Sequence, residues 1–318
     1  MYAHQVIEDL RTIYNKYAGQ KVDADMFQYF QHLRSIASLI YQSQCFHLGE
    51  GSELCNLFGK TFFGKQLFQG DTAKDVKLPY KKCFFDFYEK GNGKPLSMHE
   101  TKAPKRAIAV WEQDTDLWVC YMITFLEKLK MWVVSDYYFW ISIGKPLKEH
   151  SRFIELLELN NINTEKMSDI TNIQPVPMNK SLKSLKNINP QQIIDVEASD
   201  LSVLNVALIL LSCKNVLAMR NPAPLALNKA RRKKGKTEIF TYHTLKLVPF
   251  GNKKQYQSSQ GEPESHYRIH LCRGHFKRYA EDKPLFGKYT GLYWWQPTVR
   301  GKDKSGVVMK DYALSTSN

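Results

Sequence analysis

Three runs of aromatic and β-branched residues, separated by short polar segments, restrict most strongly the folds that this chain can adopt. The runs are RAIAVWEQ, DLWVCYMITFLE and KMWVVSDYYFWISIG, at residues 106–113, 116–127 and 130–144. Such residues favour strands, and the polar turns at DTD and near EKLK are short enough to join antiparallel neighbours. We therefore expect an antiparallel sheet, with the tryptophans of these runs in its core rather than on a base-stacking surface (Trp111, Trp118, Trp132 and Trp140).

The residues before these runs have the period of helices. Within 4–43, apolar residues recur every three or four positions, first in VIEDLRTIYNKY and then in DMFQYFQHLRSIASLIY. The run LPYKKCFFDFY, at 78–88, begins the strand-rich part. This order of elements predicts an α+β fold, with N-terminal helices followed by an antiparallel sheet.

A polar segment divides the chain. Residues 160–193 are rich in Asn, Ser, Lys and Pro and have few large apolar side chains, which is typical of a linker. Since 318 residues suffice for two domains, we place a boundary near residue 185. This predicts an N-terminal α+β domain over 1–185 and a mixed α/β domain over 186–318. In the second, EASDLSVLN begins a helix that Asp200 or Ser202 caps and that runs to about residue 219.

Positive charge is concentrated in the last third of the chain. Residues 211–318 contain 21 Lys and Arg against 7 Asp and Glu, so they carry the whole net charge of +14, while the first 210 residues contain 24 of each kind. Such a basic part indicates a polyanionic partner, with nucleic acid ahead of a membrane surface. The alternative is a basic surface that only keeps the protein soluble.

Several common classes of protein lack support in the sequence. No apolar run reaches 18 residues, and the N-terminal segment has no basic and apolar signal-peptide regions, so we expect a cytoplasmic protein without membrane contact. The six cysteines are far apart and form no CxxC, which predicts free thiols. Walker A, GxGxxG, GxSxG and zinc-deaminase motifs are absent. The sequence therefore predicts no cofactor.

The first basic segment, NPAPLALNKARRKKGKTEIFTYHTLKL, spans 221–247. Gly235 is expected to make a turn before the strand-like EIFTYHTLKLV. A dense group of cations neutralises phosphates without reading base sequence. The alternative interpretation is that these residues only form a solvated turn. The predicted phosphate contacts are Arg231, Arg232, Lys233, Lys234 and Lys236.

The second basic segment, HYRIHLCRGHFKRYAEDKPLFGKYTGLYWWQPTVRG, spans 266–301. It contains the residue types that cleavage of RNA without a metal ion would need. Cleavage of RNA through its 2′-hydroxyl needs a base, an acid and a cation over the developing phosphate charge. The candidate catalytic residues for a metal-independent ribonuclease are His275, His270, Arg273, Arg300 and Tyr279. Zinc is a weaker alternative, because the spacing of the histidines and Cys272 matches no closed zinc pattern.

Binding without catalysis is the interpretation that this segment favours. Lysine and arginine bind phosphates, and aromatic rings stack on unpaired bases. The residues predicted to do so are Lys277, Arg278, Lys288, Trp294 and Trp295. A purely structural role, with a buried histidine and a packed Trp-Trp pair, also stays open.

The motifs LNKARRKKGKTEIFTYHTLKL, RGHF, PLFGKYTG, WW and RG, followed by GVVMKDYAL, resemble a recurring family of phage, prophage and other mobile-element proteins. The resemblance covers about residues 200–313, and LPYKKCFFDF looks like a further element of that family. It implies a defence or toxin component that acts on host RNA or translation, or a counter-defence binding protein, but no established activity. Similar proteins have His where this chain has Thr298, which leaves His275 and His270 as the acid–base candidates.

Together these features predict a nucleic-acid-binding protein of phage or mobile-element type. RNA is favoured over duplex DNA, because aromatic residues beside basic ones suit unstacked bases and no recognition helix is evident. One alternative is a metal-independent ribonuclease toxin. The other is a protein-interaction module that docks on an acidic or nucleoprotein partner, with a further protein contact through the N-terminal half.

Overall fold

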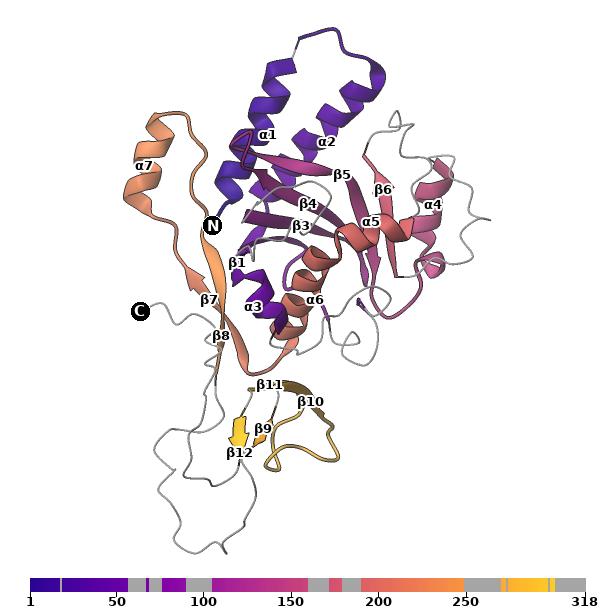
Figure 1. The fold of residues 1–318 in the computed structure, drawn as a ribbon, viewed down its shortest axis with the longest axis vertical. Helices are drawn as coiled ribbons and strands as arrows, with labels where there is room; N and C mark the ends of the chain where they lie inside the picture. The colour runs from indigo at the N-terminus through magenta and orange to yellow at the C-terminus, as the bar shows by residue number, and fades with distance from the viewer. Residues whose placement is uncertain are drawn as a thin grey trace, which may run out of the picture.

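The computed structural model describes residues 1–17, 19–56, 67–68, 76–89, 105–159, 172–178, 190–248, 270–272, 274–296 and 298–300. This part of the chain forms an eight-stranded sheet, helices on both of its faces and two short antiparallel strand pairs (Figure 1). The strand order in the sheet is β6-β5-β4-β3-β2-β1-β8-β7. Its strands in chain order are β1 (Gln44–Glu50), β2 (Lys82–Tyr88), β3 (Lys105–Asp114), β4 (Leu117–Leu126), β5 (Met131–Ser142), β6 (Ile173–Pro177), β7 (Val216–Asn221) and β8 (Tyr242–Leu247).

The predicted antiparallel meander is confirmed, and with it the α+β fold. Strands β2 to β5 each pair with the next strand in antiparallel fashion, which ends the meander at β6. Trp118, Trp132 and Trp140 are buried as expected. Trp111 is the exception: 39% of it is exposed, and the Lys82 ammonium lies 5.5 Å from the centre of its ring.

The two faces of the sheet carry different helices. The expected N-terminal helices, α1 (Ala3–Tyr17) and α2 (Ala24–Tyr41), pack on one face, and α3 (Gly51–Asn56) and α6 (Ala198–Ser212) pack on the other. Side chains alternate between faces along a strand, so Phe84 packs under α1 and α2 while Phe85 packs under α6. The remaining helices are η3 (Leu147–Glu149), α4 (Ser151–Leu159), α5 (Pro190–Val196) and α7 (Leu225–Lys233).

Helix α6 begins and ends earlier than the sequence predicts. Its N-cap is Glu197, and it ends at Ser212 rather than near residue 219. Asp200 and Ser202 are not caps, because the helix begins at Ala198 and both residues lie inside it. Asp200 accepts a hydrogen bond from Arg106 Nη1 at 3.1 Å, and the Ser202 hydroxyl donates to the carbonyl of Ala198 at 2.6 Å. The helix is apolar on all sides, which explains why it is buried along most of its length.

The sheet continues across the boundary predicted near residue 185. Strand β1 pairs in parallel with β2 on one side and with β8 on the other, and β7 then pairs antiparallel with β8. Parallel pairing with β8 gives the backbone groups on the second side of β1 their hydrogen-bond partners. The predicted linker 160–193 contains β6 and the start of α5, and its residues 160–171 and 179–189 lie outside the described residues. Strands from both predicted domains therefore belong to one sheet.

Two short strand pairs follow the large sheet. Strand β10 (His275–Tyr279) pairs with β11 (Gly291–Trp295), and β9 (His270–Cys272) pairs with β12 (Thr298–Arg300). The β10–β11 pair is attached to the loop before β7. There the buried Asn215 side chain donates to the carbonyl of Trp294 at 2.8 Å and accepts from its N–H at 3.0 Å.

We predict that Asn215→Ala lowers the free energy of unfolding by about 2 kcal/mol, because it leaves two buried backbone groups of Trp294 without partners. The matched control is Asn221→Ala at the other end of β7, where the amide is more exposed, and we expect it to cost less than about 1 kcal/mol. Urea denaturation of the intact chain measures both values. Equal losses in the two variants would contradict this role for Asn215.

Candidate nucleic-acid interface

The basic cluster at 231–236 lies at the end of a helix. Arg231, Arg232 and Lys233 form the last turn of α7, and Lys234 is its C-cap residue. The turn expected from the sequence follows at Lys234 and Gly235, and the φ of Gly235 is 65°. Cations at the C-terminus of a helix interact favourably with its dipole. The helix therefore tolerates this density of positive charge and presents it at one end.

A single carboxylate attaches this cluster to α1. Glu8 Oε1 accepts hydrogen bonds from Arg231 Nη2 and from the backbone N–H of Thr237, both at 2.8 Å. Arg231 Nε also donates to the carbonyl of Thr237 at 2.7 Å. Asn228 closes the loop further, since its side chain bonds both backbone groups of Ile239. The basic end of α7 is thus fixed beside the N-terminal helix, more than two hundred residues away in sequence.

The five predicted phosphate contacts differ in availability. Arg231 is half-buried and is held by Glu8, so the structure gives it a structural role instead of the predicted phosphate contact. Arg232 is exposed and pairs with Glu238 at 2.8 Å. Lys233, Lys234 and Lys236 are exposed, and no carboxylate of the described residues lies within ion-pair distance of them. These three ammonium groups are the part of the cluster that is available to phosphate.

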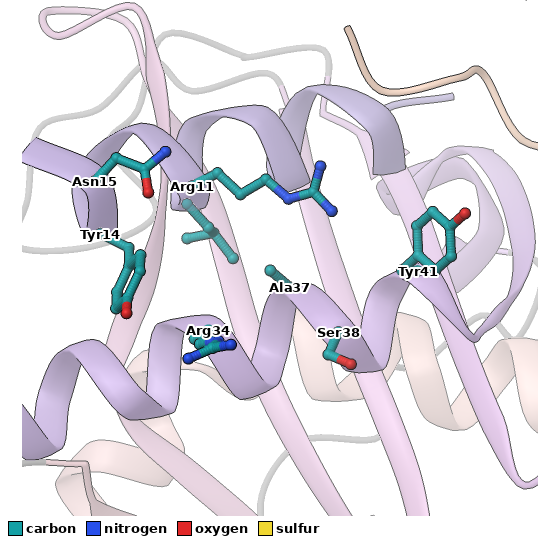
Figure 2. Close-up of a pocket in the computed structure, with 8 residues that line it drawn as sticks. Arg11, Tyr14, Asn15, Arg34, Ala37, Ser38 and Tyr41 are labelled. Carbon is teal, nitrogen blue, oxygen red and sulfur yellow. The ribbon is translucent and has the colours of Figure 1, made fainter. Parts of the chain in front are cut away.

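A groove between α1 and α2 lies beside this cluster. Its volume is about 400 Å³, and its lining includes two guanidinium groups (Figure 2). Arg11 extends along the gap between the helices, Arg34 and Tyr14 lie at one end, and Tyr41 lies at the other. The remaining lining residues are Leu10, Asn15, Ala37 and Ser38. The sequence analysis missed this groove, because no motif marks two arginines that meet only when two helices pack.

The C-terminal hairpin presents a second basic surface. His275, Lys277 and Tyr279 alternate along β10, and the Lys277 ammonium lies 5.0 Å from the centre of the Tyr279 ring. The connection to β11 carries Lys288, whose ammonium lies 4.8 Å from the Tyr289 ring. Lys277, Arg278 and Lys288 are all exposed, as a phosphate contact requires.

The Trp-Trp pair divides between the core and the surface. Trp294 is 2% exposed, and its ring packs 4.8 Å from that of Phe276. The prediction that Trp294 stacks on a base is therefore wrong: alternation along β11 turns this ring into the core shared with α6. Trp295 points the other way and is half-buried.

The predicted catalytic residues are only partly brought together. His270 and Arg300 occupy paired positions on β9 and β12, while Arg273 lies outside the described residues. His275 is exposed at the start of β10, and Tyr279 lies at the other end of the same strand.

A histidine–carboxylate pair lies elsewhere, in the middle of the sheet. His47 on β1 and Asp86 on the neighbouring β2 are in register, and His47 Nδ1 lies 2.5 Å from Asp86 Oδ1. Asp86 is fully buried and also accepts the backbone N–H of Tyr2 at 2.9 Å, whereas 25% of the His47 side chain is exposed. The signal that could have identified this pair is the acid inside the apolar run CFFDFY, because a buried carboxylate requires partners.

A third charged group, around Arg106, has the character of a structural network. Burial and then the neighbouring Asp200 raise the pKa of Glu89 to about 7, and burial also raises the pKa of Asp200. Arg106 pairs with Asp200 at 3.1 Å between β3 and α6. Throughout the described ranges, no group of three His, Cys, Asp or Glu side chains could hold a metal ion.

The comparisons with known proteins add no relative. The chain matches no protein-family model, and no curated protein and no solved structure matches it. Within the described part of the chain, no helix is both long and apolar enough to cross a membrane.

We predict that Glu8→Ala loosens α7, because it removes the acceptor of Arg231 and of Thr237. Backbone amides of 228–239 should exchange with solvent at least tenfold faster, while those of β4 should keep their rates. Glu238→Ala is the control, since its pair with Arg232 is exposed and screened by solvent. Hydrogen exchange read by mass spectrometry tests this, and unchanged rates in Glu8→Ala would contradict it.

Proposed function

We propose that this protein binds nucleic acid, with RNA favoured over duplex DNA, through the basic end of α7. The observation that carries the proposal is the fixed position of three exposed lysines without ion-pair partners among the described residues, Lys233, Lys234 and Lys236. Glu8 and Asn228 hold the backbone around them, so this backbone does not have to be ordered when phosphates bind. Cations arranged in this way bind phosphates irrespective of base sequence.

The β10–β11 hairpin supports the same function. Lys277 and Lys288 each lie over a tyrosine ring, which places cations beside aromatic surface of the kind that single-stranded nucleic acids contact. A role in a phage or mobile element, including a defence or toxin role, belongs to this proposal and rests on the resemblance of residues 200–313. Action in the cytoplasm also belongs to it, and rests on the sequence pattern of the N-terminal segment and on the short apolar runs.

We predict that replacing Lys233, Lys234 and Lys236 together by Gln raises the Kd for a 12-nucleotide single-stranded RNA about 30-fold near 0.1 M salt. The slope of log affinity against log salt should fall by about 2, because each lost phosphate contact removes about 0.7 for a single strand. The control replaces three other exposed lysines by Gln, Lys128, Lys145 and Lys148. Fluorescence anisotropy over a salt series measures both quantities.

Two outcomes would overturn the proposal. One is equal affinity and salt slope in the two triple variants. The other is no binding of RNA or DNA by the wild-type chain. If the wild-type chain binds neither RNA nor DNA, a protein partner becomes the better explanation of the basic surface. The exposed apolar residues of edge strand β7, Leu217 and Met219, offer a surface for such a partner.

A second candidate function is metal-independent cleavage of RNA, which the His47–Asp86 pair favours. In this candidate mechanism, Nδ1 of His47 donates its proton to Asp86, and Nε2 acts as the base. It takes the proton of a ribose 2′-hydroxyl, whose oxygen then forms a bond to the adjacent phosphorus. The bond from phosphorus to the 5′-oxygen breaks, and that oxygen takes a proton from water. The hydroxide that is left takes the proton from His47, which restores the base. This moves the chemistry from the predicted His275 and His270 to β1.

We predict that, if the protein cleaves RNA in EDTA, His47→Ala slows cleavage at least 100-fold without changing the Kd, because a positioned base contributes about 10²–10⁴ in rate. His275→Ala, a variant of the exposed hairpin histidine, should cleave like the wild type. Denaturing gels resolve intact and cleaved RNA. Loss of cleavage in His275→Ala but not in His47→Ala would return the active site to the hairpin, and no cleavage by the wild type would remove this candidate.

A further inference from the structure

We propose that the groove between α1 and α2 is a second nucleic-acid contact, one that takes a single-stranded segment, with its phosphates on Arg11 and Arg34 and a base on Tyr41. The inference rests on the proposed function and specifies the class of nucleic acid. It assigns a binding role to the N-terminal half of the chain, whose net charge gives no sign of one.

The first step concerns charge. Two exposed guanidinium groups face one groove, and none of the residues that line it is acidic. In the part of the chain that the structure describes, neither Arg11 nor Arg34 forms an ion pair, whereas Arg106, Arg231 and Arg232 each pair with a carboxylate. Guanidinium groups bind phosphate oxygens through two parallel hydrogen bonds, so two of them in a recess form an anion site.

The second step concerns continuity with the basic end of α7. Glu8, which holds Arg231, lies three residues before Arg11 and therefore on the same side of α1. At the other end of the groove, the ring of Tyr41 contacts that of Phe240, with their centres 5.7 Å apart. Phe240 follows the lysine cluster in the segment that leads to β8. Two carboxylates near this path, those of Glu8 and Glu238, are each paired with an arginine.

The third step concerns shape. A volume of about 400 Å³ between two packed helices admits a phosphate and a base but not a double helix. Tyr41 is 59% exposed and offers a ring face at the rim. Tyr14 is engaged differently, because the Arg34 guanidinium lies 5.8 Å from the centre of its ring. Stacking on an exposed aromatic ring requires an unpaired base, which is why the groove favours single strands.

The test compares variants of the intact chain with a 12-nucleotide single-stranded RNA and with a duplex of the same length. Arg11→Gln combined with Arg34→Gln should raise the Kd for the single strand about tenfold and lower its salt slope by about 1.4, as expected for two lost phosphate contacts. The control, Arg152→Gln with Lys148→Gln, removes the same charge from exposed residues near α4 and should change neither quantity. Tyr41→Ala should weaken single-strand binding about fivefold, leave the salt slope unchanged and leave duplex binding unaffected.

The outcomes separate the two proposals. If the lysine triple variant loses affinity while the Arg11 and Arg34 double variant matches its control, the groove proposal is wrong and the function of α7 stands. If Tyr41→Ala weakens duplex and single strand equally, the assignment to single strands is wrong. If the wild type binds neither nucleic acid, both proposals fall together. The two arginines of the groove and the two cations of its control variant are all exposed. Both double variants should therefore keep the wild-type melting temperature.

Discussion

The parallel pairing of β1 with strands on both of its sides is the constraint on which the rest of the structure depends. Because β8 lies next to β1, the chain that leads into β8 must pass the N-terminal helix. That chain carries the lysine cluster, and Glu8 of α1 holds it in place through Arg231 and Thr237. Charge that is concentrated in the last third of the sequence therefore lies beside arginines from its first 40 residues.

Ion pairing sorts the cations of this protein into two kinds. Arg106, Arg231 and Arg232 each have a carboxylate partner, and the first two connect elements that are far apart in sequence. Lys233, Lys234, Lys236, Arg11 and Arg34 have none among the described residues and are exposed. A count of basic residues treats both kinds alike, although only the second kind is available to a polyanion. The proposed interface is defined by what remains after internal pairing, not by net charge.

The local elements could be predicted from the sequence, and their long-range partners could not. Aromatic and β-branched runs correctly predicted the meander, and helical periodicity correctly predicted α1 and α2, because both signals are local. The parallel position of β8 and the burial of Trp294 depend on packing with distant residues, which no short pattern encodes. Asp86 shows the intermediate case: the acid within an apolar strand indicates a buried partner, but only the register of β1 identifies it as His47.

Hydrogen exchange of the intact chain, with and without a 12-nucleotide single-stranded RNA, tests the central claim most directly, because it locates the bound surface without any substitution. A continuous surface predicts slower exchange in 225–240 and in both α1 and α2, with no change in α4. Protection confined to the β10–β11 hairpin, or protection of 225–240 without that of α1 and α2, would contradict an interface that joins the two ends of the chain.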